Sequence, residues 1–211
     1  AMQVVLNNAE TLAFIADRDN GLLISTTNLQ APTVIGYFNT TSSFNRNALG
    51  VALNKAETLA FVACPDKGLM IVNVTDIYNP YQVSNLAGQG SGRIILNQAE
   101  SLAFIGGIGN AVAIANVTDP SIPIQISSFN SGAGGWFVLN QAETLAFVLN
   151  FCCIVTYNIV NPSFPTQIGS SSNIGISGRR AMIINQNDTL IFLGDYVDGW
   201  SESPAVLDFL I

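Results

Sequence analysis

The sequence predicts an all-β fold: a five-bladed β-propeller of four-stranded antiparallel blades whose fifth blade is incomplete. The first observation behind this prediction is a repeat. The phrase LNNAETLAFIA at Leu6–Ala16 recurs in four further copies. Every copy has an asparagine in its second position, and these asparagines are Asn7, Asn54, Asn97, Asn140 and Asn185. Their period of 43 to 47 residues indicates a repeat architecture. The second observation is that short apolar runs alternate with Asn, Gly, Pro and Ser, which is typical of strands joined by tight turns.

The second unit illustrates the elements of one repeat. Its turns are expected at Asn54–Glu57, Pro65–Gly68 and Thr75–Pro80, because Asn, Pro and Gly favour turn geometry. Between them the apolar runs predict four strands, Gly50–Leu53, Thr58–Cys64, Leu69–Val74 and Tyr81–Leu86. The second strand of each unit is almost wholly apolar, which favours a sheet covered on both faces by its neighbours. Four-stranded sheets repeated around an axis form a propeller.

We expect one domain that belongs to a longer polypeptide, with repeats at about 1–46, 47–91, 92–134, 135–179 and 180–211. The fifth unit offers only three strand-like runs, the last at Ala205–Ile211. An open strand edge is a template for pairing. The sequence therefore predicts that this blade is completed by further residues or by a neighbouring chain.

Composition excludes several classes of function. The net charge of −7 argues against nucleic-acid binding, because phosphates attract a cationic surface. Histidine is absent, which removes the commonest general base and metal ligand. No apolar run reaches the roughly 18 residues of a membrane-spanning helix. We expect no cofactor.

Two segments carry a resemblance to a known family. GLMIVNVTDIYNP at Gly68–Pro80 and NAVAIANVTDPSIP at Asn110–Pro123 resemble the LVIVD repeat, although Asn73 and Asn116 stand where that family has Asp. The resemblance extends unit by unit along the chain. It implies a propeller on a secreted or cell-surface protein, with no defined activity.

The links between units differ most and are the expected binding surface. They comprise Asn39–Leu49, Asn85–Arg93, Asn130–Trp136 and Gly169–Arg180. In a four-stranded meander these links share one face, which we call the link-bearing face, and the first turns lie on the opposite face. Four of the seven basic residues fall in them, and no acidic residue does. The predicted binding residues are Arg46, Arg93, Arg179 and Arg180, with Trp136 as a stacking surface. Acidic residues recur instead in the first turn of every unit, at Glu10, Glu57, Glu100, Glu143 and Asp188, where we expect them to accept backbone hydrogen bonds. The alternative for the links is ordinary loop solubility, with Trp136 capping the core.

Other motifs give weaker hypotheses. Sequons for N-glycosylation occur at Asn39, Asn73, Asn116 and Asn187, although repetition of a favourable turn also explains the middle two. Asp17 and Asp19 before Gly21 resemble part of a calcium loop, for which a plain hairpin is the favoured alternative. The adjacent Cys152 and Cys153 suggest a vicinal disulfide, against the alternative of separate thiols.

The resulting hypothesis is a non-catalytic extracellular structural or interaction module, and not an enzyme. Its expected partners are other copies or surface proteins, which would add strands at the fifth blade or meet head to tail in a filament or surface layer. The alternative is a lectin-like, carbohydrate-binding propeller that uses the links. A propeller enzyme is less favoured, because the link-bearing face lacks paired carboxylates or a histidine near the axis.

Overall fold

A computed structural model describes most of the chain as antiparallel β-structure. It describes residues 3–28, 30–40, 48–88, 90, 92–107, 111–130, 136–149, 153–171, 180–184 and 190–194, the last two segments as backbone only. These residues contain strands and turns and no helix. Accordingly, no helix long and apolar enough to cross a membrane is found among them.

Four antiparallel meanders make up most of the described structure, and we call them blades 1 to 4. Blade 1 contains β1 (Gln3–Leu6), β2 (Leu12–Asp17), β3 (Gly21–Thr26) and β4 (Val34–Phe38). Blade 2 contains β5 (Gly50–Leu53), β6 (Leu59–Cys64), β7 (Gly68–Asn73) and β8 (Tyr81–Leu86). Blade 3 contains β9 (Ile94–Leu96), β10 (Leu102–Gly106), β11 (Ala111–Asn116) and β12 (Ile124–Asn130). Blade 4 contains β13 (Trp136–Leu139), β14 (Leu145–Leu149), β15 (Ile154–Asn158) and β16 (Thr166–Ser170).

The repeated asparagine builds the first hairpin of each blade. In blade 1 the Asn7 Oδ1 atom accepts the backbone N–H groups of Thr11 and Leu12, both at 2.8 Å. Asn54, Asn97 and Asn140 make the same pair of bonds in the following blades. This side-chain cap satisfies the backbone where the chain turns, which explains why the motif returns with every unit.

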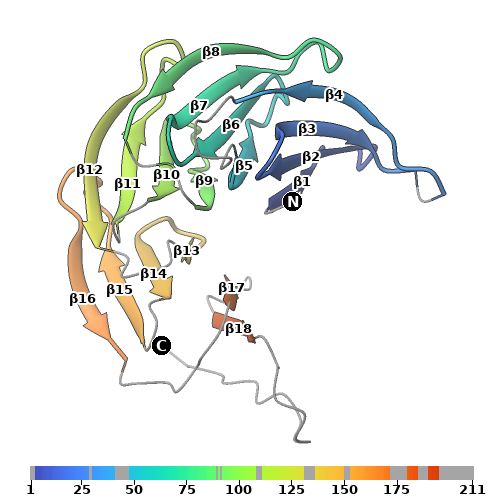
Figure 1. The fold of residues 1–211 in the computed structure, drawn as a ribbon. Helices are drawn as coiled ribbons and strands as arrows, with labels where there is room; N and C mark the ends of the chain where they lie inside the picture. The colour runs from blue at the N-terminus through green and yellow to red at the C-terminus, as the bar shows by residue number, and fades with distance from the viewer. Residues whose placement is uncertain are drawn as a thin grey trace, which may run out of the picture.

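The blades stack through apolar side chains and follow one another around an open arc (Figure 1). The innermost strands β1, β5, β9 and β13 face the centre, and β4, β8, β12 and β16 form the rim. One side of each sheet, which we call its outgoing face, carries a phenylalanine toward the next blade: Phe14, Phe61, Phe104 and Phe147. The opposite, incoming face packs against the preceding blade. A core cluster fills each of the three junctions between blades 1 and 4.

A second contact joins the blades at the rim. The pairing of the third and fourth strands shifts register at one equivalent place in every blade, after Ile24, Ile71, Ile114 and Thr156. In blades 1 to 3 the residue paired beside this bulge meets the outer turn of the next blade. The Ser84 hydroxyl donates to the Pro120 carbonyl oxygen at 2.6 Å, and the Ser127 hydroxyl donates likewise to Pro162.

The described elements do not form a closed five-bladed ring. The fifth unit contributes a hairpin of β17 (Arg180–Ile184) and β18 (Leu190–Gly194), and β17 lies beside β13. Figure 1 shows a gap between this hairpin and blade 1. The predicted third strand of that unit, Ala205–Ile211, lies outside the described residues. The four-stranded meanders predicted from the sequence are confirmed.

Candidate functional site

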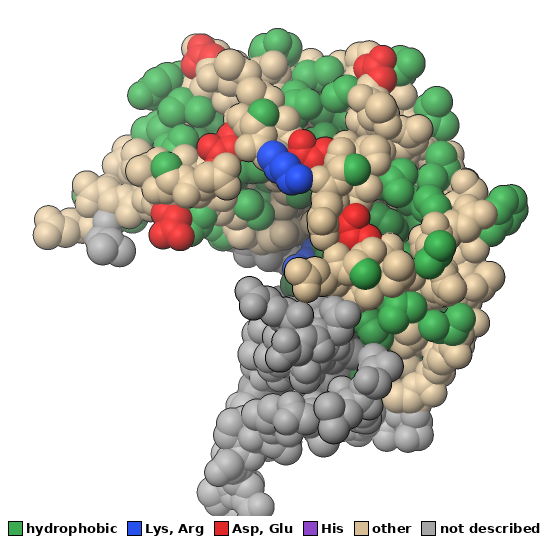
Figure 2. Space-filling model, turned by 180° about the vertical axis from the view of Figure 1, so that it is seen from behind, with side chains coloured by type: hydrophobic (Ala, Val, Ile, Leu, Met, Phe, Trp, Pro, Cys, Tyr) green, Lys and Arg blue, Asp and Glu red, His purple; other side chains and the backbone are tan. Residues whose placement is uncertain are grey.

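The face of the arc that carries the first turns is a hydrogen-bonded seam between blades. The Glu57 carboxylate accepts the backbone N–H of Asn8, Glu100 accepts that of Lys55, and Glu143 accepts that of Gln98. Figure 2 views this face, where acidic side chains follow the inner margin of the arc. The prediction that these acids accept backbone hydrogen bonds is confirmed for the three. The sequence did not predict that each N–H donor belongs to the preceding blade.

Side chains reinforce the same seam. The Lys55 ammonium donates to the Gln98 carbonyl oxygen at 2.6 Å, and the Gln98 amide donates to the Gln141 carbonyl oxygen at 2.8 Å. Lys55, Gln98 and Gln141 occupy one repeat position, directly after the capping asparagine. Equivalent side-chain bonds to a backbone carbonyl therefore join blade 2 to blade 3 and blade 3 to blade 4. The carboxylates of Glu57, Glu100 and Glu143 therefore serve the junctions between blades.

The opposite, link-bearing face offers a different set of groups near the centre. Gln3, Gly50, Arg93 and Trp136 occupy one repeat position, where the innermost strand of each blade begins. The Gln3 side-chain oxygen accepts the backbone N–H of Val51 at 3.3 Å. The Arg93 guanidinium donates to the carbonyl oxygen of Phe137, the neighbour of Trp136, at 3.4 Å. This bond places the Arg93 guanidinium at the backbone of the residue that follows Trp136, so both predicted binding residues lie near the start of β13.

The Arg93 side chain is half-buried, and Trp136 is exposed. Burial removes water from the Arg93 guanidinium and lowers its pKa below the ordinary value. Arginine stays charged in proteins, so the half-buried group remains a cation of low hydration. Trp136 keeps 40% of its surface exposed, which leaves an indole available to a ligand.

The remaining predicted binding residues are not placed at this site. Arg46 and Arg179 lie outside the described residues. Arg180 begins β17, and its backbone alone is described. The wider arginine-lined mouth therefore stays a prediction, of which the Arg93 position is the described part.

The suspected calcium loop is a hairpin turn, and the Asp17 carboxylate accepts hydrogen bonds from residues of that same turn. The Asp17 Oδ1 atom accepts the backbone N–H groups of Asp19 and Asn20 and the side-chain amide of Asn20. Although partial burial opposes it, these bonds together lower the pKa of Asp17. No group of three or more metal-ligating side chains occurs in the part of the chain that the structure describes.

Two of the sequons belong to the repeated outer turn. The Asn73 and Asn116 side-chain oxygens accept the backbone N–H groups of Thr75 and Thr118, at 3.0 and 2.9 Å. This local role fits the alternative that repetition produced these sequons. Asn39 is exposed just after β4. Asn187 lies outside the described residues, and glycosylation stays a prediction.

The structure describes two of the cysteines, Cys64 and Cys153. Cys64 is buried in the junction between blades 1 and 2, and burial raises its pKa to about 12. Its thiol is therefore protonated at neutral pH and is a poor nucleophile. Cys152 lies outside the described residues, so the vicinal disulfide with Cys153 stays a prediction.

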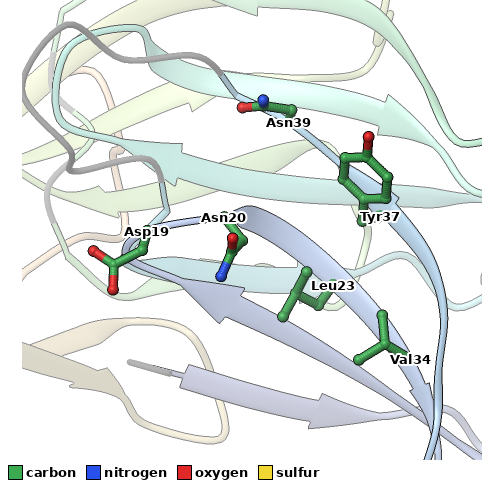
Figure 3. Close-up of a pocket in the computed structure, with 6 residues that line it drawn as sticks. All are labelled: Asp19, Asn20, Leu23, Val34, Tyr37 and Asn39. Atoms are coloured by element: carbon green, nitrogen blue, oxygen red, sulfur yellow. The ribbon is translucent and has the colours of Figure 1, made fainter.

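Two hollows occur on blade 1 and its border with blade 2. The first has a volume of about 310 Å³ and is lined by Asp19, Asn20, Leu23, Val34, Tyr37 and Asn39 (Figure 3). The second, of about 510 Å³, lies at the rim and is lined by residues 37–39 and 78–81, including Tyr37, Tyr78 and Tyr81. The first hollow lies within blade 1, whereas the second depends on the contact between blades 1 and 2.

No family model and no curated protein matches the chain, so the LVIVD resemblance stays a prediction. Solved structures with the same fold do match. One is a periplasmic gluconolactonase from Pseudomonas aeruginosa, with a TM-score of 0.70 at 12% identity over 90% of this chain and 61% of that one. A candidate 6-phosphogluconolactonase from Bacteroides fragilis matches with a TM-score of 0.66 at 14% identity over 90% and 61%. A functionally unknown protein from Desulfotomaculum acetoxidans matches with a TM-score of 0.68 at 14% identity over 92% and 62%.

These matches show a propeller-like fold and correct the functional prediction. The chain spans about six-tenths of the length of each matched structure, 61 to 62%. The non-catalytic structural or filament-forming module, with its lectin-like alternative, is contradicted by neighbours that are named as lactonases. The sequence pattern pointed to a structural role because the repeated residues are scaffold, and scaffold is shared by propellers of many functions.

Proposed function

We propose that this chain is part of a propeller hydrolase that opens small anionic lactones at the link-bearing face of the arc. The observation that carries the proposal is the hydrogen bond from the Arg93 guanidinium to the Phe137 carbonyl oxygen, which places this cation at the start of β13, next to Trp136 in the sequence. The fold of the matched lactonases supports the reaction class. The proposal departs from the sequence-based expectation that the chain is not an enzyme, and the assay below decides between them.

The chemistry of the pair defines the substrate class. A guanidinium recognises carboxylate or phosphate through paired hydrogen bonds, and it does so more strongly where water is excluded. The exposed indole of Trp136 offers a flat apolar surface for the CH face of a sugar-derived ring. In the reaction, water adds to the lactone carbonyl carbon and the ring ester C–O bond breaks, which yields the open hydroxy acid. Arg93 is assigned to binding and orientation of the anionic substituent.

We also propose that the five sequence units are five consecutive blades of one ring. The support is the common repeat motif and the place of β17 beside β13, where the innermost strand of a fifth blade belongs. The matched structures are longer than this chain, which spans 61 to 62% of their length.

The test measures lactone opening above the spontaneous rate on matched anionic and neutral aldonolactones. We expect turnover of the anionic lactone, and an increase in its KM of about 10- to 100-fold in Arg93→Gln, the equivalent of a charged hydrogen bond worth about 1.5–3 kcal/mol. The neutral lactone should be affected much less. Arg18→Gln removes an exposed arginine from a turn of blade 1 and is the matched control.

Two outcomes contradict the proposal. One is a rate equal to the spontaneous rate on every lactone of the panel. The other is turnover that Arg93→Gln and Arg18→Gln change equally, because the charge at the centre would then have no special role. Trp136→Ala provides a second check, since it should raise KM for both lactones.

A further inference from the structure

The incoming face of blade 1 repeats the pattern of the buried incoming faces of blades 2 to 4. Five positions on β1, β2 and β3 are apolar in every blade. In blade 1 they are Val4, Leu6, Ala13, Ile15 and Leu23, and in blade 2 they are Val51, Leu53, Ala60, Val62 and Met70. Val51 is 0% exposed, whereas its equivalent Val4 is 53% exposed and the adjacent Leu6 is 47% exposed. The sequence of blade 1 therefore suits burial that the described residues do not provide.

The hollow shown in Figure 3 lies on this same face. Leu23, Val34 and Tyr37 line it from β3 and β4, and Asn20 and Asn39 lie toward one end. In blade 2 the equivalent of Leu23 is Met70, which is buried in the junction with blade 1. The hollow is thus the shape that a packed neighbouring blade fills elsewhere in the molecule.

The hydrogen bonds that join the first turns of neighbouring blades also stop at blade 1. Glu57, Glu100 and Glu143 are half-buried, and each accepts a backbone N–H from the preceding blade. Their equivalent, Glu10, is exposed, and no described residue donates to its carboxylate. Glu10 has the same left-handed backbone, with φ of 55°, as Glu100 and Glu143. Its carboxylate is therefore held in the geometry that accepts a preceding blade.

We propose that the incoming face of blade 1 is the docking surface for a further four-stranded blade of the same repeat, placed in the same ring. The occupant would present a phenylalanine-bearing outgoing face to Val4 and Leu6 and a turn N–H to Glu10. A protein with the length of the matched structures, of which this chain spans 61 to 62%, has residues enough for such a blade. The main support is that blades 2, 3 and 4 each bury the equivalent face against the preceding blade.

A second copy of the chain fits this surface less well. A two-fold dimer would place the incoming face against itself, with Glu10 facing Glu10 and no N–H donor for either. A head-to-tail dimer would require the outgoing face of blade 4. That face is already covered, since Val138, Phe147 and Leu149 are buried.

The test adds a blade to the chain. A copy of residues 48–90 is joined ahead of residue 1, so that the link to β1 has the length of the native link to β9. A second extension uses residues 91–133, in case one copy folds poorly in its new place. Hydrogen exchange and urea unfolding are measured for the original and the extended chains, each with Leu6→Lys, Glu10→Ala or Leu53→Lys.

We expect the extension to raise the protection of the Val4–Leu6 amides by about tenfold or more, the equivalent of about 1.4 kcal/mol. Leu6→Lys and Glu10→Ala should lower the urea midpoint clearly in an extended chain and little in the original one. Leu53→Lys, at an internal junction, should lower it in both. These readouts do not involve lactone opening, so they succeed or fail independently of the proposed function.

The proposal is overturned if both added blades stay unprotected while Leu6→Lys has the same small effect with and without them. It is also overturned in favour of a second copy if light scattering shows that the original chain is a dimer and Leu6→Lys dissociates it.

Discussion

At the scale of single residues, four glutamates have left-handed backbone angles that are unfavourable for a non-glycine residue, and three of them bond to the preceding blade. Glu10, Glu57, Glu100 and Glu143 have φ angles of 55° to 56°, a region that non-glycine residues seldom occupy. In the last three, the carboxylate that this geometry positions accepts an N–H from the preceding blade. Residue identity at this turn is therefore explained by the junction and not by the turn, which glycine would suit better.

Replacing one of these glutamates tests that explanation. We expect Glu100→Ala to lower the free energy of unfolding by about 1.5–3 kcal/mol, because a charged hydrogen bond to the Lys55 N–H is lost. Glu10→Ala is the matched control, since both residues have a φ of 55° and the change in backbone strain cancels. Urea unfolding of both variants gives the difference, and equal destabilisation would contradict the role of the seam.

At the scale of strands, the bulged outer pair determines how closely neighbouring blades approach. Gly36 in β4 and Gly169 in β16 occupy the same position as Ser84 and Ser127, beside the bulge. A Cβ atom on Gly36 would collide with the carbonyl oxygen of Ile77 in blade 2. A Cβ atom on Gly169 would have its nearest neighbour at 4.0 Å, the Thr156 Cβ of its own blade.

The two glycines should therefore respond differently to one substitution. We expect Gly36→Ala to lower the free energy of unfolding by about 1–3 kcal/mol, because the blades must separate to admit the methyl group. Gly169→Ala should be neutral or slightly stabilising, since alanine restricts the unfolded chain. Thermal or urea unfolding measures both, and a neutral Gly36→Ala would show that the junction is looser than the structure indicates.

Much of the strand pattern could be predicted from sequence, and much of the site could not. The predicted Gly50–Leu53 and Tyr81–Leu86 match β5 and β8, and the predicted Leu69–Val74 differs from β7 by one residue at each end. These boundaries follow from turn residues that act locally. The shared repeat position of Arg93 and Trp136 could be read from the sequence, and the bond from Arg93 to the Phe137 carbonyl oxygen could not. The seam and the hollow at the border of blades 1 and 2 depend on which blade packs against which face, and no local signal specifies that.

At the scale of the whole molecule, the stack of blades determines where stability resides. Each blade is packed only against its neighbours, so stability is approximately the sum of blade and junction terms. Blades 2 and 3 have two buried faces, whereas the incoming face of blade 1 leaves Val4 and Leu6 half exposed. The same arc places the Arg93 and Trp136 pair between blades 3 and 4, away from that exposed end.

This arrangement predicts that the chain opens first at blade 1. The Phe14 and Phe61 amides provide a matched comparison, because they lie at equivalent positions of β2 and β6 within the similar segments LAFIA and LAFVA. Their chemical exchange rates should therefore be alike. We expect the Phe14 amide to be at least about tenfold less protected than the Phe61 amide, since a local opening of blade 1 breaks one junction and an opening of blade 2 breaks two. Hydrogen exchange in the native state measures both amides. Equal protection would mean that the blades unfold together and that the junctions couple them more strongly than nearest-neighbour packing explains.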